Sequence, residues 1–222
     1  MATLHCNLNR AANVAAQSLF ITGTDTGVGK TYVACQLIRR YVEQGYKVVG
    51  MKPVAAGCEL VDGCWVNEDV ALLTEASNVK APPHLINPYC FNPPIAPHIA
   101  AEEAGIEIQF EVIKAAYAQL ALMADVVIVE GAGGLLVPLH GQKTIADLIQ
   151  YLDIPVTLVV GLKLGCINHT ALSLTFIKQR ELALKEVVVN QLDKTLLCVD
   201  ENIESIRNLL IGNEYITFSH VL

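Results

Sequence analysis

Short apolar runs alternate with stretches of helical spacing along most of the chain. The runs are rich in valine and isoleucine and too short for buried helices, which favours buried strands. They cover residues 19–21, 47–51, 125–130, 155–161 and 187–190. Between them, apolar residues recur every three or four positions, most clearly in residues 34–41, 110–123, 145–152 and 167–177. Strands that alternate with helices predict an α/β fold, a three-layer, doubly wound and mostly parallel sheet.

The remaining segments set the expected limits of this domain. Residues 54–66 contain glycines and no clear period, so we expect a loop there. Six prolines between Pro82 and Pro97 predict an ordered crossing loop rather than a helix, with a short extended piece at 89–91. Residues 1–17 form an expected N-terminal extension, partly disordered, and residues 18–222 a single domain. A terminal strand is expected near Ile216.

Composition restricts the class of protein. The chain has 222 residues, of which 53% are hydrophobic and 6% aromatic, so its core is aliphatic, as in sheets covered on both faces. A net charge of -7 argues against nucleic-acid binding. Apolar runs stay below the roughly 18 residues of a membrane span. Seven cysteines without paired C-x-x-C spacing fit neither a disulfide framework nor a zinc site, and we expect a cytoplasmic protein.

The stretch from Gly23 to Thr31 fits the phosphate-loop pattern G-x-x-x-x-G-K-[ST] between a strand and a helix. In such a loop, backbone N–H groups surround phosphates, the lysine reaches the outer phosphates and the hydroxyl holds Mg²⁺. The helix that follows points its N-terminus at the bound anion. We therefore expect a nucleotide site formed by Gly27, Val28, Gly29, Lys30 and Thr31.

Two acids are candidate magnesium ligands beside Thr31. Glu130 ends a strand of valine and isoleucine, where an unpaired carboxylate is costly to bury. Asp69 lies in the first turn of a helix that Asn67 is expected to cap. Mg²⁺ commonly takes one or two carboxylates plus phosphate oxygens, so Thr31, Asp69 and Glu130 form a plausible set. The alternative for Asp69 is an acid favoured by the helix dipole alone.

Other residues at expected strand ends are open to two interpretations. Lys52 follows the second strand, although lysine is usually exposed and a surface role is the simpler explanation. Backbone N–H groups of Gly165, Cys166 and Ile167 could hold an anion, or merely begin a helix. His98 is better explained as a structural residue. Ligands of doubly wound sheets gather at the carboxyl ends of the strands, where these candidates converge.

Several motifs resemble dethiobiotin synthetase, a ligase family of biotin synthesis, in order and spacing. They are residues 23–31, 52–57, 87–89, 96–98, 129–134 and 163–169. The resemblance implies a phosphate-loop NTPase sheet and a homodimer that uses ATP and Mg²⁺. Its reaction joins 7,8-diaminopelargonate and CO₂ into a cyclic urea.

The same resemblance assigns roles to matched residues. Lys30 and Lys52 become catalytic, neutralising phosphates and a carbamate, while Thr26 and Gly133 contact the substrate or phosphate. The helix start at 165–167 would receive the distal carboxylate of the substrate across the dimer interface.

Some positions depart from the family pattern. Many relatives have an acid where Gly27 stands and a serine at Ala56, and the segment that borders the base in many members is shortened here. Asn190 is expected to pair with a purine edge. Asp193 follows it by three residues, as in the guanine-reading signature of GTPases, so two base preferences remain open.

A second functional class is a partitioning or positioning ATPase, which switches on DNA or a membrane. Such proteins carry an extra lysine five positions before the motif lysine, where this chain has Asp25. A basic or amphipathic terminal helix is also not evident. A nucleotide-binding module without catalysis is a third, weaker alternative.

Overall fold

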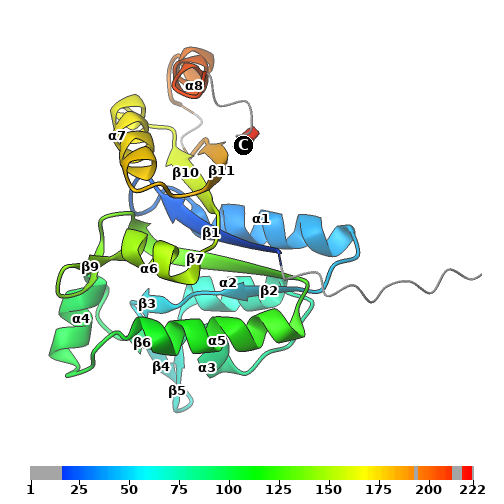
Figure 1. Ribbon diagram of the computed structural model, residues 1–222, viewed down its shortest axis with the longest axis vertical. Helices are drawn as coiled ribbons and strands as arrows, with labels where there is room; N and C mark the ends of the chain where they lie inside the picture. The colour runs from blue at the N-terminus through cyan, green and yellow to red at the C-terminus, as the bar shows by residue number, and fades with distance from the viewer. Residues whose placement is uncertain (1–16, 193–194, 212–216, 222) are drawn as a thin grey trace, which may run out of the picture.

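A six-stranded parallel sheet forms the centre of the protein in the computed structural model, which describes residues 17–192, 195–211 and 217–221 (Figure 1). The strand order is β12-β11-β10-β1-β7-β2. Every neighbouring pair in this sheet is parallel. The carboxyl ends of all six strands therefore share one edge, and the sequence prediction of a doubly wound parallel sheet is confirmed.

The central strands are β1 (Gln17–Gly23), β2 (Val48–Met51), β7 (Val126–Gly134), β10 (Val156–Gly161), β11 (Leu184–Asn190) and β12 (Thr217–Val221). The helices are α1 (Lys30–Glu43), α2 (Glu68–Ala76), α3 (Pro83–Ile86), α4 (Pro97–Glu103), α5 (Phe110–Met123), α6 (Ile145–Leu152), α7 (Cys166–Gln179) and α8 (Val199–Asn208). Three small sheets pair β3 (Val54–Ala56) with β6 (Tyr89–Phe91), β4 (Glu59–Val61) with β5 (Cys64–Val66), and β8 (Pro138–His140) with β9 (Lys143–Thr144).

The two faces of the sheet bury separate hydrophobic clusters. Leu19 and Ile21 pack with α1 and α2 on one face, whereas Phe20, between them, packs with α5 and α6 on the other. Successive strand residues point to opposite faces, so a strand covered on both sides must be apolar throughout. This is the physical reason for the continuous apolar runs, and it gives the expected three layers.

Several local predictions need correction. The segment 54–66, expected to be a loop, contains β3, β4 and β5. The segment 82–97 has the expected extended piece as β6 but also a short helix, α3, which begins at a proline where the missing N–H costs nothing. β1 begins at Gln17, two residues before the expected strand, so the last residue of the expected extension belongs to the sheet. Residues 1–16 of that extension lie outside the described residues, as does Ile216. In the described parts of the chain, no helix combines the length and apolarity needed to cross a membrane.

Candidate functional site

The phosphate-loop sequence occupies the turn from β1 into α1, as predicted. Gly27 and Gly29 have φ of 73° and 86°, a left-handed backbone that favours glycine. The buried Lys30 bends back over the loop, and its Nζ donates to the carbonyl oxygen of Asp25 at 3.1 Å. Burial lowers the pKa of Lys30. The loop thus holds a cation directly at the start of α1, where an anion would be favoured.

Asn190 supports this loop from the neighbouring part of the sheet. It ends β11, is buried, and donates from Nδ2 to the carbonyl oxygen of Val28 at 3.0 Å. A Cβ at Gly29 would lie 2.0 Å from that Nδ2. Asn190 can therefore occupy this place only because residue 29 has no side chain. No pattern along the chain predicted this contact. Its expected pairing with a purine base stays a prediction, and Asp193 lies outside the described residues.

The two predicted acids and Lys52 converge on Thr31. Thr31 Oγ1 lies 2.7 Å from Asp69 Oδ1 and 2.9 Å from Glu130 Oε1. Lys52 Nζ donates to Asp69 Oδ2 and, at 2.7 Å, to Glu130 Oε1. The end of β2, the strand β7 and the first turns of α1 and α2 therefore meet at one cluster, and α2 is capped by Asn67 as expected. Glu130 does not end its strand as expected, because β7 continues to Gly134.

Burial controls the charges of this cluster. Lys52 is 5% exposed and Glu130 1%, so Lys52 is not the surface lysine of the simpler explanation. Burial raises the pKa of Glu130. Burial opposes the charge on Lys52 as well, but the attraction of the Glu130 and Asp69 carboxylates outweighs it and raises the pKa of Lys52. Burial also opposes the charge on Asp69, but Lys52 outweighs it and lowers the pKa of that carboxyl. Lys52 consequently stays a cation between the two carboxylates.

The same cluster fits a magnesium ion. Glu130 Oε2 is buried without a hydrogen-bond partner, an expensive arrangement unless another ligand satisfies it. The donor atoms of Thr31, Asp69 and Glu130 are all oxygens, which Mg²⁺ prefers. Groups of three or more His, Cys, Asp or Glu residues placed to hold a metal are not found in the described residues. Mg²⁺ is nonetheless commonly bound by one or two carboxylates together with phosphate oxygens, and this cluster offers two carboxylates and a hydroxyl beside a phosphate loop.

A cavity of about 410 Å³ opens beside the phosphate loop. It is bounded by the loop, by the segment after β7 and by the middle of α7, and its lining residues are 23–26, 134–138, 172, 173 and 176. Thr26 lines it, and a Cβ at Gly133 would lie 3.5 Å from Thr26 Oγ1, so the structure brings these two predicted residues together. The cavity has room for a small substrate next to the phosphates.

The predicted anion site at 165–167 does not line this cavity. Gly165 caps α7, and the backbone N–H of Cys166 already donates to the carbonyl oxygen of Lys163 at 3.0 Å. The Cys166 side chain is buried. These residues lie at the start of α7, while Leu172, Ser173 and Phe176 of its middle turns reach the cavity. Their role toward a substrate stays a prediction.

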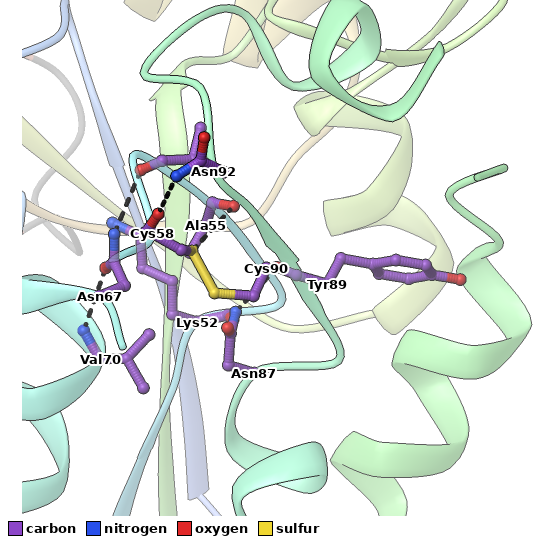
Figure 2. Close-up of a disulfide and its surroundings, with 10 residues drawn as sticks. Lys52, Ala55, Cys58, Asn67, Val70, Asn87, Tyr89, Cys90 and Asn92 are labelled. Atoms are coloured by element: carbon purple, nitrogen blue, oxygen red, sulfur yellow. Dashed lines mark hydrogen bonds between the residues drawn. A yellow bond between two sulfur atoms is a disulfide. The ribbon is translucent and has the colours of Figure 1, made fainter. Parts of the chain in front are cut away.

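A disulfide joins Cys58 to Cys90, which the sequence did not predict (Figure 2). The expectation that the cysteines form no disulfide is wrong for this pair, because β3 and β6 pair in register and bring segments 32 residues apart together. Around it, Asn87 Nδ2 donates to the carbonyl oxygen of Lys52 at 2.6 Å and Asn67 Nδ2 to that of Ala56 at 3.1 Å. The bond thus lies among the contacts that position Lys52 and the cap of α2.

Comparisons with known proteins agree with this geometry. A family model described as an AAA domain matches residues 17–211. An ATP-dependent dethiobiotin synthetase of Nitrosospira multiformis is 50% identical over 86% of this chain and 83% of its own length. One from Aromatoleum aromaticum is 48% identical over 85% and 84%. The chain belongs to the dethiobiotin synthetase family.

Solved structures of other proteins show the same fold. A ParA family ATPase from Chlorobium tepidum superposes with a TM-score of 0.55 at 13% identity, covering 93% of this chain and 85% of that one. At such low identity the likeness concerns the fold alone.

One departure from the dethiobiotin synthetase pattern can be examined in the structure. Nothing lies within 4 Å of a Cβ built at Gly27, so an acidic side chain would have room there. Its φ of +73° nevertheless favours glycine. An acidic side chain at this position would therefore have space but a strained backbone.

Proposed function

We propose that this chain is an ATP-dependent dethiobiotin synthetase. It joins 7,8-diaminopelargonate and CO₂ into the cyclic urea of dethiobiotin, with ATP cleaved to ADP and phosphate. Lys52 carries the proposal, because this buried cation lies between two carboxylates that also accept from the phosphate-loop threonine. The identity of about half the residues with enzymes of that name supports the same reaction.

The proposed chemistry has three steps. One amine of the substrate adds to CO₂ with loss of a proton and gives a carbamate. A carbamate oxygen then attacks the γ-phosphorus, while the bond from that phosphorus to the oxygen of the leaving ADP breaks. The second amine attacks the carbon of this mixed anhydride, and the ring closes as phosphate leaves. Each intermediate gathers negative charge.

Residues of the chain supply positive charge where it is needed. Lys30, at the start of α1, would turn from the Asp25 carbonyl toward the outer phosphates, since a phosphate oxygen is the stronger acceptor for its ammonium. Lys52 would neutralise the carbamate and the transferred phosphoryl group. Preorganised charges of this kind stabilise a transition state without reorganisation at the moment of reaction.

Mg²⁺ would be held by Thr31, Asp69 and Glu130 and would supply charge neutralisation at the phosphate oxygens. The cavity bounded by Thr26 would receive the diamine end of the substrate. Its distal carboxylate would bind at the 165–167 helix start of a second copy, so the functional unit is a homodimer. We place the enzyme in the cytoplasm.

The decisive experiment measures phosphate release from ATP with each reactant omitted in turn. Release should require both the diamine and CO₂, and ¹³CO₂ should enter the product as a single labelled carbon by mass spectrometry. A partitioning-type ATPase would release phosphate without the diamine. Release that ignores the diamine would therefore overturn the proposal.

A further inference from the structure

Asp25 places a carboxylate inside the loop that is proposed to bind polyphosphate. Its Oδ1 accepts from the backbone N–H of Thr26 at 2.7 Å, and its carbonyl oxygen accepts from Lys30 Nζ. Asp25 thus helps to hold the conformation of the first half of the loop. A negative charge at that place would repel an incoming nucleotide unless a cation balances it.

Lys163 provides that cation from a neighbouring loop. Its Nζ lies 2.5 Å from Asp25 Oδ2, and this hydrogen bond lowers the pKa of the Asp25 carboxyl. Lys163 belongs to the loop between β10 and α7, and β10 pairs directly with β1, the strand that leads into the phosphate loop. The two loops leave the sheet side by side, with the Thr24 N–H donating to the Val159 carbonyl oxygen at 2.9 Å.

Folding stability does not account for this ion pair. Both side chains are more than 40% exposed, at 45% for Lys163 and 43% for Asp25, and exposed pairs contribute little to stability. A polyanion bound next to Asp25, in contrast, would be repelled more by an unpaired carboxylate than by one paired with Lys163. The pair also joins the phosphate loop to the segment that begins α7.

We propose that Lys163 is a positioning residue for the nucleotide, which balances the charge of Asp25 and anchors the first half of the phosphate loop. The inference rests on the proposed use of ATP by this loop. Asp25 accepts from the Thr26 N–H and so holds the loop. Lys163 neutralises the carboxylate that does this, so that it does not repel a bound polyphosphate. Removing both charges together should therefore harm binding less than removing Lys163 alone.

Calorimetric titration of the full chain with Mg-ADP tests this charge balance. Lys163→Met should weaken binding of Mg-ADP by about tenfold, because it leaves the Asp25 carboxylate unpaired near the phosphates. Solvent screens this repulsion and keeps the loss moderate. Lys163→Arg should bind like the wild type. Asp25→Asn with Lys163→Met should recover to within about threefold of it, because asparagine still accepts from the Thr26 N–H. The loss in Lys163→Met should also shrink as salt is raised.

Lys178→Met, at the other end of α7, is the matched control, as it removes the same charge from an exposed site. Thermal unfolding without nucleotide should be alike in all variants. Wild-type affinity in Lys163→Met, or a double variant as weak as that single one, would overturn the role of Lys163. If the wild type itself fails to bind Mg-ADP, the proposed function fails instead.

Discussion

At the residue scale, the proposed chemistry depends most on Lys52. Changing Lys52→Gln keeps a hydrogen-bond donor but removes the charge that Glu130 and Asp69 share. We expect kcat to fall by about 10²-fold or more, because one lost contact in a preorganised site commonly has that effect. Steady-state phosphate release measures it, with Lys47→Gln, an exposed lysine just before β2, as control. Near-normal turnover in Lys52→Gln would remove this residue from the mechanism.

The same variant should become sensitive to pH. Burial already raises the pKa of Glu130 above its ordinary value of 4.5, and without Lys52 the charged carboxylate loses its neighbour cation. A group whose pKa is raised by folding stabilises the protein below its unfolded pKa and loses that contribution as pH rises. Thermal unfolding should therefore show a deficit for Lys52→Gln that grows as pH rises above about 4.5. A deficit independent of pH would contradict this account.

The residues of this cluster differ in how far the sequence could predict them. The motif itself predicted Thr31 and Lys30, because phosphate binding needs those residue types at fixed spacing. The burial of Lys52 needed the three-dimensional arrangement, since a lysine after a strand is usually exposed. The contact of Asn190 with the Val28 carbonyl depends on a side chain brought from β11. A pattern along the chain holds no information on such a contact.

At the element scale, the Cys58–Cys90 bond should contribute to stability through the β3 and β6 pair. For a separation of 32 residues, the chain-entropy account gives about 3.7 kcal/mol. A thiol-free reductant should then lower the unfolding midpoint by about 7–15 °C. Cys58→Ala with Cys90→Ala should unfold at that lower temperature with or without reductant. Cys198→Ser, which changes an exposed free cysteine, serves as the control. Alkylation of both Cys58 and Cys90 in untreated protein would refute the bond.

Element prediction succeeded where a periodic pattern extended over several turns and failed where short strands depend on their partners. The helix at 110–123 has the expected bounds, because apolar residues recur over four turns. The strands β3, β4 and β5 have three residues each, too few to show alternation. Each of them depends on a partner strand: β3 pairs with β6, and β4 pairs with β5. The disulfide was missed for the same reason.

At the scale of the whole molecule, we expect a homodimer. Leu164, just before α7, and Leu172, within it, are 97% and 63% exposed, which favours burial against a second copy. Light scattering at assay concentration should give twice the 24.0 kDa of one chain. Leu164→Glu should give monomers with at least tenfold lower activity, whereas Leu122→Glu, 89% exposed at the end of α5, should remain dimeric. A fully active wild-type monomer would contradict this arrangement.

The strand order has a consequence for the synthesis of the protein. β1 is translated early, yet its sheet neighbours are β7 and β10, and Phe20 pairs in register with Val129 and Val156. At a translation rate of about 5–20 residues per second, the ribosome makes the β10 partner roughly 7 to 27 s after β1. For most of that time, until Val129 of β7 is made about 5 to 22 s after β1, the apolar strand before the phosphate loop has neither of its partners. Unpaired strands of this kind invite aggregation. The nascent chain of this enzyme should therefore depend on holding chaperones until residue 161 has left the exit tunnel.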